Sequence, residues 1–342
     1  MFGEQCYVIA EIGNNHCGDI DLCIKTIEEA KACGSSAVKL QRRSNKDLFT
    51  TSFYQSPYDN PNSYGVTYGE HRDFLELSDS EMIKARKCAK DIGIDFICTP
   101  FDIPSVDFLS THLELDAWKI ASADLRNRQL QKRIISGENR EIPIIISTGG
   151  YSLKDAKDTV DYLKNDFKKI SVLHCISSYP TPPSLVNLSC IQALKDLLDN
   201  DVYVGYSSHD NGIALSLASR VLGAAVIEKH FTLDRSMKGT DHAMSANPTM
   251  LRKLVKDLEK IDESIGNGHK TRLDQEEKPL IKMIKSPYAK RKLTKDHVLC
   301  MEDISFKVPY TGIDFKDAET MIGKTLKKDL NFESQINLED LR

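Results

Sequence analysis

The sequence lacks a long hydrophobic run. No apolar stretch in its 342 residues approaches the length of about 20 that a membrane-spanning helix requires. The first residues, MFGEQCYVIAEIG, also lack the basic start and the apolar core of a secretion signal. We therefore expect a cytoplasmic protein that is neither exported nor inserted into a membrane.

An excess of charge of one sign is missing as well. The 46 Lys and Arg residues nearly balance the 50 Asp and Glu residues, and the formal net charge is −4. Proteins that bind nucleic acids or anionic membranes usually concentrate positive charge. This composition therefore predicts neither kind of partner.

Paired cysteine motifs are also absent. The nine cysteines are an odd number, and they are spread through the chain without any CxxC spacing. A disulfide framework or a cysteine-rich zinc site would show pairs at short spacing. The pattern indicates reduced thiols that pack as small core residues.

What the sequence does contain is a regular alternation of short apolar runs with helical patterns. Eight such units in about 250 residues are typical of a (β/α)8 barrel. A doubly wound sheet is the alternative, but it gathers its polar residues at one or two switch points. Here nearly every predicted strand ends in a polar side chain, which favours the TIM barrel. The predicted strands are residues 6–12, 37–41, 95–101, 117–122, 142–148, 170–177, 202–208 and 225–231.

Composition changes near residue 265 and predicts a second domain. We expect a TIM-barrel catalytic domain over residues 1–265, a polar linker over 266–285 and a small, mostly β domain over 286–342. About 55 residues bury little core on their own. The small domain should therefore dock on the barrel or on a neighbouring subunit.

Residues 44–78 are too long and too aromatic for an ordinary strand–helix connection, which typically spans about 2–6 residues. We expect this insertion to fold over the barrel mouth after the second strand. Packing, rather than a disordered excursion, is indicated by five aromatic residues: Tyr54, Tyr58, Tyr64, Tyr68 and Phe74.

Two histidines, His209 and His230, stand at the ends of neighbouring predicted strands. A helical pattern joins these strands, with Asp210 or Asn211 as its expected N-cap. Adjacent parallel strands lie about 4.8 Å apart, so both imidazoles can converge on one ion. Two imidazoles completed by water or substrate oxygens suit Mn2+, and imidazole also suits Zn2+, Fe2+ and Co2+.

Two lysines, Lys39 and Lys119, lie inside otherwise apolar strands, where an unpaired ammonium group is costly to bury. A salt bridge to a barrel carboxylate explains each of them alone. Hydroxyl groups at corresponding strand ends favour a phosphate site instead: Thr99, Ser122, Ser147, Ser177 and Ser207. With Glu11 at the top of the first strand, these groups suggest carbon–carbon bond formation between a phosphorylated three-carbon unit and a polyhydroxy aldehyde.

Motifs along the whole chain resemble those of the sialic acid synthase family. They include AEIGNNHCGD, SSAVKLQ, TPFD, WKIASAD, IISTGG, HCISSYPTPP, GYSSHDNGIA and EKHFTLDRSMKGTDHAMS, with the tail KLTKDHVLCMEDISFKVPYTGI. The resemblance implies a barrel followed by an antifreeze-like (SAF) domain. It also implies condensation of phosphoenolpyruvate with N-acetylmannosamine, its 6-phosphate or a related diacetamido sugar. The implied assembly is a domain-swapped homodimer, in which the small domain of one subunit covers the barrel of the other.

The resemblance also implies roles for individual residues. A divalent metal, Mn2+ first and Mg2+ or Co2+ as alternatives, would be held by His209 and His230. The sugar and the proton or water steps would fall to Glu11, Tyr179 and Asp241. Phosphoenolpyruvate would be bound by Lys39, Thr99, Lys119, Ser122, Ser147, Ser177 and Ser207.

Three positions depart from the family pattern. In the SAF domain, Val308-Pro309-Tyr310 stands where an Arg-Pro-Gly turn is usual, and the preceding Lys307 lacks the planar fork of arginine. Ala123 and Gly150 replace the usual glycine and methionine. These departures leave the acceptor open, including the sugars that lead to legionaminic or pseudaminic acids. A Schiff-base aldolase that uses Lys119 is an alternative, because burial in an apolar strand lowers the pKa of a lysine.

Overall fold

The computed structural model describes residues 3, 5–137 and 141–342. The chain divides into two compact units, Met1–Gly266 and Asn267–Arg342. The division falls next to the position at which the composition of the sequence changes.

The first unit is a closed barrel of eight parallel strands that follow one another in chain order. The barrel closes where Glu11 of the first strand pairs with His230 of the last. The predicted TIM barrel is therefore confirmed. Its strands are β1 (Tyr7–Gly13), β2 (Ala37–Arg42), β3 (Asp95–Pro100), β4 (Ala117–Ile120), β5 (Ile144–Ser147), β6 (Ile170–Cys175), β7 (Tyr203–Ser208) and β8 (Val226–His230).

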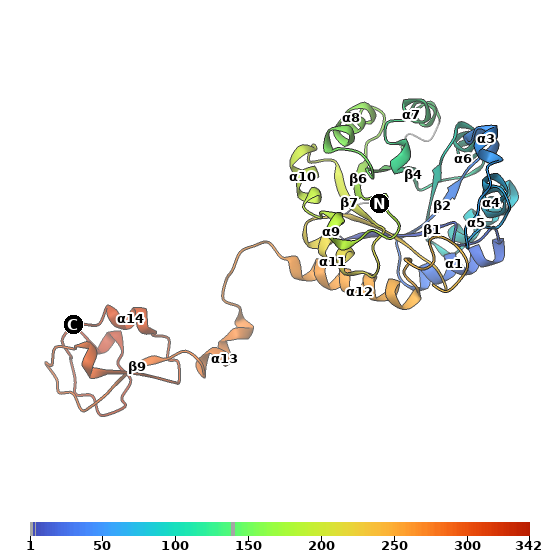
Figure 1. Cartoon of the computed structure of the whole chain (residues 1–342). Coiled ribbons are helices and arrows are strands. Elements are labelled where there is room, and N and C mark those ends of the chain that lie inside the picture. The colour runs from blue at the N-terminus through green and yellow to red at the C-terminus, as the bar shows by residue number, and fades with distance from the viewer. Residues whose placement is uncertain (1–2, 4, 138–140) are drawn as a thin grey trace. The chain divides into compact units, whose positions relative to one another are not determined.

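Helices surround this barrel as an outer ring (Figure 1). Trp118 of β4 and many other strand residues that face outward are buried beneath them. The ring consists of α1 (Ile20–Ala32), α5 (Asp79–Ile92), α6 (Ile103–His112), α7 (Arg128–Ile135), α8 (Leu153–Leu163), α10 (Cys190–Leu197), α11 (Ala214–Val221) and α12 (Pro248–Ile265). Shorter helices lie in the connections: α2 (Asn45–Leu48), α3 (Thr51–Tyr54), α4 (Tyr68–Leu75) and α9 (Pro183–Val186).

The predicted N-cap of the helix between the two histidines is wrong. The helix α11 begins at Ala214, and neither Asp210 nor Asn211 caps it. Asp210 is instead buried. Its carboxylate accepts hydrogen bonds from the hydroxyls of Tyr206, at 2.9 Å, and Ser208, at 2.5 Å. These partners belong to β7. The carboxylate therefore stabilises the end of that strand and is not available to cap the helix in the way that the sequence pattern predicts.

The inner face of the barrel has an apolar part and a polar part. The apolar part is a cluster of buried side chains: Tyr7, Ile9, Ala37, Ile97, Ala117, Ile145, Leu173 and Val226. Side chains alternate between the two faces of a strand, so the residue two positions further along points inward again. At those positions stand Glu11, Lys39, Thr99, Lys119, Ser147, Cys175 and Glu228. The polarity therefore changes toward the carboxyl ends of the strands, where TIM barrels carry their active sites.

The insertion after β2 is folded, as the aromatic content of residues 44–78 predicts. The rings of Tyr64 and Phe74 stack with centroids 4.4 Å apart, and Tyr58 stacks on His71 at 4.6 Å. Tyr68 joins the cluster through an edge contact with Tyr58. A capping box between Thr67 and Glu70 begins α4. The insertion thus presents α4 as a packed helix.

The second unit is built around a small antiparallel sheet of β9 (Ser286–Ala289) and β10 (Ile304–Lys307). Two further short helices are α13 (Glu277–Ile281), inside the stretch expected to be a linker, and α14 (Phe315–Glu319). Lys307 forms an ion pair with Glu333 of the same unit, so its charge already has a partner. The buried core contains Ala289, Leu293, Leu299, Ile304, Ala318, Met321, Leu326, Leu330, Ile336 and Leu341.

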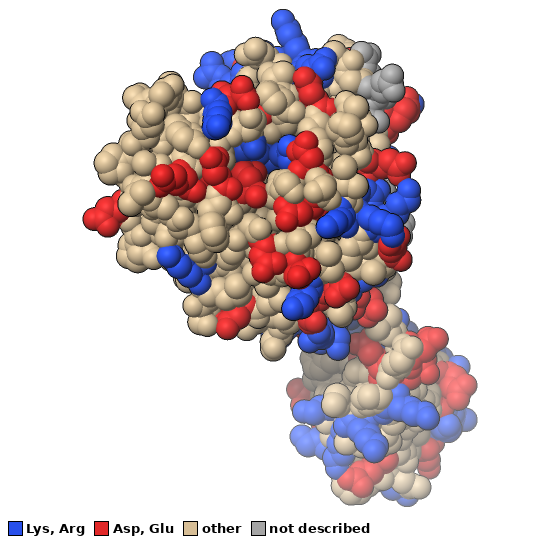
Figure 2. All heavy atoms as spheres, turned by 90° about the vertical axis from the view of Figure 1, so that its right-hand side faces the viewer, with Lys and Arg blue, Asp and Glu red and all other residues tan. Residues whose placement is uncertain are grey.

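Acidic and basic side chains are interspersed on the face shown in Figure 2. This distribution agrees with the balanced composition of the sequence. No helix in the described part of the chain is long and apolar enough to cross a membrane.

Candidate active site

A cavity of about 670 Å³ lies at the carboxyl ends of the barrel strands. Every site residue that the sequence predicts lines it, although the residues come from strands far apart in the chain. They are Glu11, Lys39, Thr99, Lys119, Ser122, Ser147, Ser177, Tyr179, Ser207, His209, His230 and Asp241. The strand-end pattern thus places these side chains around one space.

The floor of the cavity is a network of buried charges. Nζ of Lys39 lies 2.8 Å from Oε2 of Glu11 and 3.7 Å from Oε1 of Glu228. It also donates a hydrogen bond to Oγ1 of Thr99 at 3.1 Å. Nζ of Lys119 lies 3.9 Å from Oε2 of Glu228 and donates to Oγ of Ser147 at 2.7 Å. Each lysine therefore has a carboxylate partner while it faces the cavity.

Burial and ion pairing shift the pKa values of these buried groups in different directions. Burial lowers the pKa of Lys119, and attraction to Glu228 only partly offsets that effect. For Lys39, burial also lowers the pKa, but Glu11 and Glu228 outweigh it and the pKa is raised. Burial raises the pKa of Glu11 despite the nearby ammonium group. An incoming anion would therefore compete with two carboxylates for the lysines.

The loops after β4, β5 and β6 meet at Gly149. Its backbone N–H donates to Oγ of Ser122 at 2.9 Å. A Cβ atom at this position would lie only 2.3 Å from Oγ of Ser177. Gly150, where the family usually has methionine, has a φ of 83°, a left-handed conformation that glycine adopts without strain. The absence of a side chain at Gly149 thus lets the hydroxyls of Ser122 and Ser177 converge.

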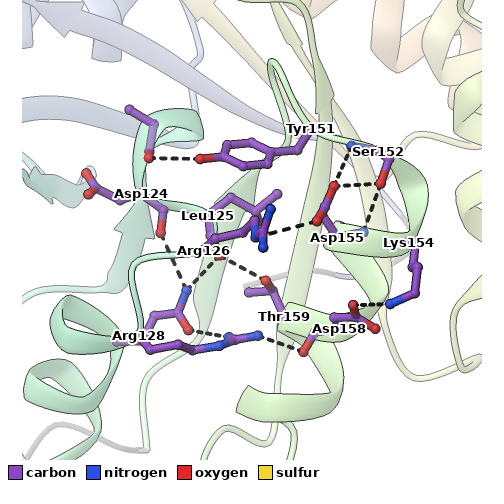
Figure 3. Close-up of polar contacts among 12 residues, drawn as sticks. Asp124, Leu125, Arg126, Arg128, Tyr151, Ser152, Lys154, Asp155, Asp158 and Thr159 are labelled. Atoms are coloured by element: carbon purple, nitrogen blue, oxygen red, sulfur yellow. Dashed lines mark hydrogen bonds and ion pairs between the residues drawn. The ribbon is translucent and has the colours of Figure 1, made fainter.

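Further polar contacts connect the loop after β4 to the segment that begins α8 (Figure 3). The hydroxyl of Tyr151 donates to the carbonyl of Ala123 at 3.3 Å, and Oγ1 of Thr159 donates to the carbonyl of Leu125 at 2.9 Å. An ion pair joins Arg126 to Asp155 at 3.6 Å. These contacts fix the short 3-10 turn that carries Ser122.

The two histidines form the opposite wall. Their ring centroids are 5.4 Å apart, and the ring of Tyr179 lies 4.0 Å from that of His209. Nδ1 of His209 donates to the carbonyl of Ile176 at 2.6 Å, which leaves Nε2 as the free ring nitrogen. Nδ1 of His230 is buried without a hydrogen-bond partner among the described residues, 3.7 Å from Oδ2 of Asp241. Burial lowers the pKa of His230, which favours the neutral ring.

Eight further polar or charged residues line the cavity although the sequence-based site does not include them: Asn14, Gln41, Arg43, Asn62, Arg72, Cys175, Glu228 and Thr240. Glu228 and Gln41 lie two residues from His230 and Lys39, so strand periodicity was the available signal. Nε2 of Gln41 donates to Oε1 of Glu11 at 2.6 Å. Arg72 belongs to α4, and no strand pattern points to it.

Comparisons with known proteins show which family this chain resembles. Residues 26–270 match the model of the NeuB family. The chain is 35% identical over 323 residues to N-acetylneuraminate-9-phosphate synthase of Homo sapiens, which covers 94% of this chain and 88% of that protein. It is 36% identical over 333 residues to N,N'-diacetyllegionaminic acid synthase of Campylobacter jejuni, with coverage of 95% and 97%.

A solved structure is also similar. The crystal structure of N-acetylneuraminic acid synthetase from Leptospira borgpetersenii, in complex with citrate, has a TM-score of 0.69 and 30% sequence identity to this chain. It covers 81% of this chain, and 91% of that chain is matched. The sequence match, the relatives and the shared fold show that the chain belongs to the NeuB family of nonulosonic acid synthases.

Proposed function

We propose that the protein condenses phosphoenolpyruvate with an N-acetylmannosamine-like aldose, or its 6-phosphate, to give a nonulosonic acid and phosphate. C3 of phosphoenolpyruvate attacks the aldehyde carbon of the open-chain sugar. Water adds at C2, and phosphate leaves with cleavage of the C–O bond. The relatives named above are synthases of N-acetylneuraminate 9-phosphate and of N,N'-diacetyllegionaminic acid, which supports an amino-sugar aldose as the acceptor.

The observation that carries the proposal is the pair of buried ammonium groups, Lys39 and Lys119, at the floor of a polar cavity. Ammonium groups and hydroxyl donors suit the phosphate and carboxylate of phosphoenolpyruvate. The same cations stabilise negative charge on the phosphate as it leaves. The hydroxyl donors are Thr99, Ser122, Ser147, Ser177 and Ser207.

His209 and His230 fit a divalent metal ion. Their ring centroids are 5.4 Å apart, and the buried Nδ1 atom of His230 has no hydrogen-bond partner among the described residues. No group of three or more His, Cys, Asp or Glu side chains is arranged for a metal in the described part of the chain. Water or substrate oxygens would complete the coordination, which suits Mn2+ and also Mg2+ or Co2+. When bound, the ion supplies Lewis-acid polarisation of the aldehyde.

Glu11 is the residue proposed to orient the water or to move its proton. Its carboxyl group is buried, and its pKa is raised by that burial. A raised pKa brings a carboxyl group closer to the working pH, which suits a group that transfers a proton. Tyr179 and Asp241, on the histidine wall, are proposed to contact the sugar.

The experiment that tests this reaction is condensation in water labelled with 18O. The purified protein is incubated with Mn2+, phosphoenolpyruvate and each acceptor in turn: N-acetylmannosamine, mannose, their 6-phosphates and the two diacetamido-trideoxyhexoses. Cleavage of the C–O bond places the label in the sugar acid and leaves the released phosphate unlabelled. Label in the phosphate, or no acceptor-dependent release, would exclude the proposed reaction.

The second unit is proposed to be an SAF domain that completes the active site of another subunit in a swapped homodimer. Its core is small, and the segment before it is polar. A chain truncated after residue 270 should fold but turn over poorly. Mixing it with a full-length His209→Ala chain should restore activity, because the intact barrel then receives a domain from its partner. Inactive mixtures that are known to exchange subunits would contradict the swap.

A Schiff-base aldolase that uses Lys119 is the second candidate. The observation in its favour is the pKa of Lys119, which burial lowers. Borohydride reduction in the presence of a sugar acid would trap such an intermediate on Lys119. A protein that turns over but traps nothing, and that loses activity with EDTA, would exclude it.

A further inference from the structure

Two arginines line the cavity without a part in the reaction described above. Arg43 follows β2, and Arg72 lies in α4 of the insertion. The guanidinium group of Arg43 stacks on the ring of Phe101, 3.8 Å from its centroid. The insertion therefore contributes positive charge to the cavity wall.

These two arginines share a single carboxylate. Nη1 of Arg43 lies 3.4 Å from Oε1 of Glu76, and Nη2 of Arg72 lies 3.5 Å from the same oxygen. Arg43 also donates to Oε1 of Gln41 at 2.6 Å. Burial and the nearby Arg72 lower the pKa of Arg43 to about 10. Two guanidinium groups against one carboxylate leave an unmatched positive charge.

The hydrogen-bonding capacity of Arg72 is only partly used, because its Nη2 atom meets Oε1 of Glu76 at 3.5 Å without the geometry of a hydrogen bond. The residue is 9% exposed, and its Nε and Nη2 atoms are buried without a hydrogen-bond partner among the described residues. Leaving buried donors unsatisfied costs stability. A structural arginine looks different: Arg291 in the second unit donates from both Nε and Nη2 to Asp303. The incompletely paired guanidinium group of Arg72 at the cavity wall therefore points to an anionic ligand.

We propose that Arg43 and Arg72 bind the phosphoryl group of a phosphorylated acceptor sugar. This inference rests on the proposed condensation and narrows its acceptor to an aldose phosphate. The forked guanidinium group matches the oxygen geometry of a phosphate monoester. A phosphate in the cavity would balance the positive charge that Glu76 alone leaves unmatched.

The position of the arginine pair assigns it to the acceptor rather than to phosphoenolpyruvate. Arg43 bonds to Gln41, and Gln41 bonds to Glu11, so the pair lies on the far side of Glu11 from His230. About two strand spacings of 4.8 Å separate β8 from β2. An extended six-carbon aldose with a terminal phosphate can bridge that span, with its aldehyde at the histidines.

The test compares the acceptor preference of wild type, Arg72→Met and Arg72→Lys in the full-length protein. Phosphate release from phosphoenolpyruvate is measured with N-acetylmannosamine and with its 6-phosphate. Wild type should prefer the 6-phosphate. Arg72→Met should lower the ratio of the two kcat/KM values about ten- to a hundredfold, because charge-assisted hydrogen bonds are lost. The loss should appear mainly in the KM of the phosphosugar, and Arg72→Lys should restore part of it.

Arg133→Met is the matched control. This arginine lies in α7, is paired with Asp107 and is half exposed, so its removal should leave the ratio unchanged. A melting temperature of Arg72→Met at or above that of wild type would agree with a binding role, since the variant removes unsatisfied buried donors. A wild type that prefers the neutral sugar would overturn the inference. An equal loss for both sugars, accompanied by a lower melting temperature, would overturn it as well.

If no sugar supports phosphate release, the proposed condensation is wrong. The phosphate site is then tested separately, by measuring the binding of a sugar phosphate. The probes are then mannose 6-phosphate and mannose, compared by the rise in melting temperature that each causes. If mannose 6-phosphate raises the melting temperature, mannose does not, and the effect is lost in Arg72→Met, the anion site is supported. Equal stabilisation by both probes, or by neither, would remove it.

Discussion

Nζ of Lys39 lies 2.8 Å from Oε2 of Glu11, and this ion pair connects β2 with β1 beneath the cavity. The ammonium group favours the ionised form of the carboxyl group and partly offsets burial, which still raises the pKa of Glu11. An anion that attracts Lys39 weakens this effect of the ammonium group. Binding of phosphoenolpyruvate is therefore coupled to the protonation of Glu11.

We expect phosphoenolpyruvate to bind with uptake of a proton at pH 8, where its own groups are ionised. Withdrawal of Lys39 from Glu11 raises the pKa of the carboxyl group further, so the direction is uptake and not release. Calorimetry in buffers of different ionisation enthalpy measures it. Glu11→Gln should abolish the uptake, and a binding enthalpy independent of buffer in wild type would contradict the coupling.

Removal of either lysine at the cavity floor should weaken the binding of phosphoenolpyruvate more than the binding of the sugar. Lys39→Ala and Lys119→Ala are each expected to raise the KM for phosphoenolpyruvate about ten- to a hundredfold. The control is Lys229→Met, because Lys229 is equally buried in β8 but does not line the cavity. It should change stability and leave this KM within about twofold. Larger changes in the KM of the sugar would mean that the lysines serve the acceptor.

Loss of either histidine proposed to bind the metal should remove activity without unfolding the barrel. His209→Ala and His230→Ala are each expected to lower kcat/KM by about a thousandfold, the scale of lost Lewis-acid stabilisation. Affinity for Mn2+ should fall with it, as titration by electron paramagnetic resonance would show. His174→Ala is the control, since His174 is buried against the carbonyl of Val186 outside the cavity. It should lower the melting temperature and leave Mn2+ affinity unchanged.

Lys229 should make the barrel more stable at alkaline pH. Burial lowers its pKa to about 8, and Asp210 opposes this only in part. Between about pH 8 and the ordinary lysine pKa of about 10.4, the unfolded chain binds a proton that the folded chain does not. The free energy of unfolding therefore rises with pH in this window, by up to about 3 kcal/mol.

Comparison with Lys229→Met isolates this contribution. Urea denaturation can be followed by the fluorescence of Trp118, which is the only tryptophan and is buried in the barrel. The difference in unfolding free energy, wild type minus variant, should increase from pH 7 to pH 10.5. Parallel profiles for the two proteins would show that Lys229 titrates normally.

The barrel and most of the candidate site could be predicted because both depend on local patterns. Strand periodicity and polar strand ends predicted that Lys39, Lys119 and His230 lie in one cavity. The pairing of both lysines with Glu228 could not be predicted, because it depends on the distance between strands around a closed barrel. Arg72 was missed for a similar reason, since the path of the insertion is set by tertiary packing.

The residues proposed for phosphoenolpyruvate and those proposed for the acceptor phosphate are distributed differently along the chain. The side chains proposed for phosphoenolpyruvate are scattered from β2 to β7, so no single segment can replace them without rebuilding the barrel. Arg43, Arg72 and Glu76 instead belong to one continuous stretch of the chain. Such a continuous segment can be replaced as a unit by the corresponding segment of a related chain. Gain or loss of the proposed phosphate contacts therefore needs change in one short region, while the side chains proposed for phosphoenolpyruvate stay fixed by the closed barrel.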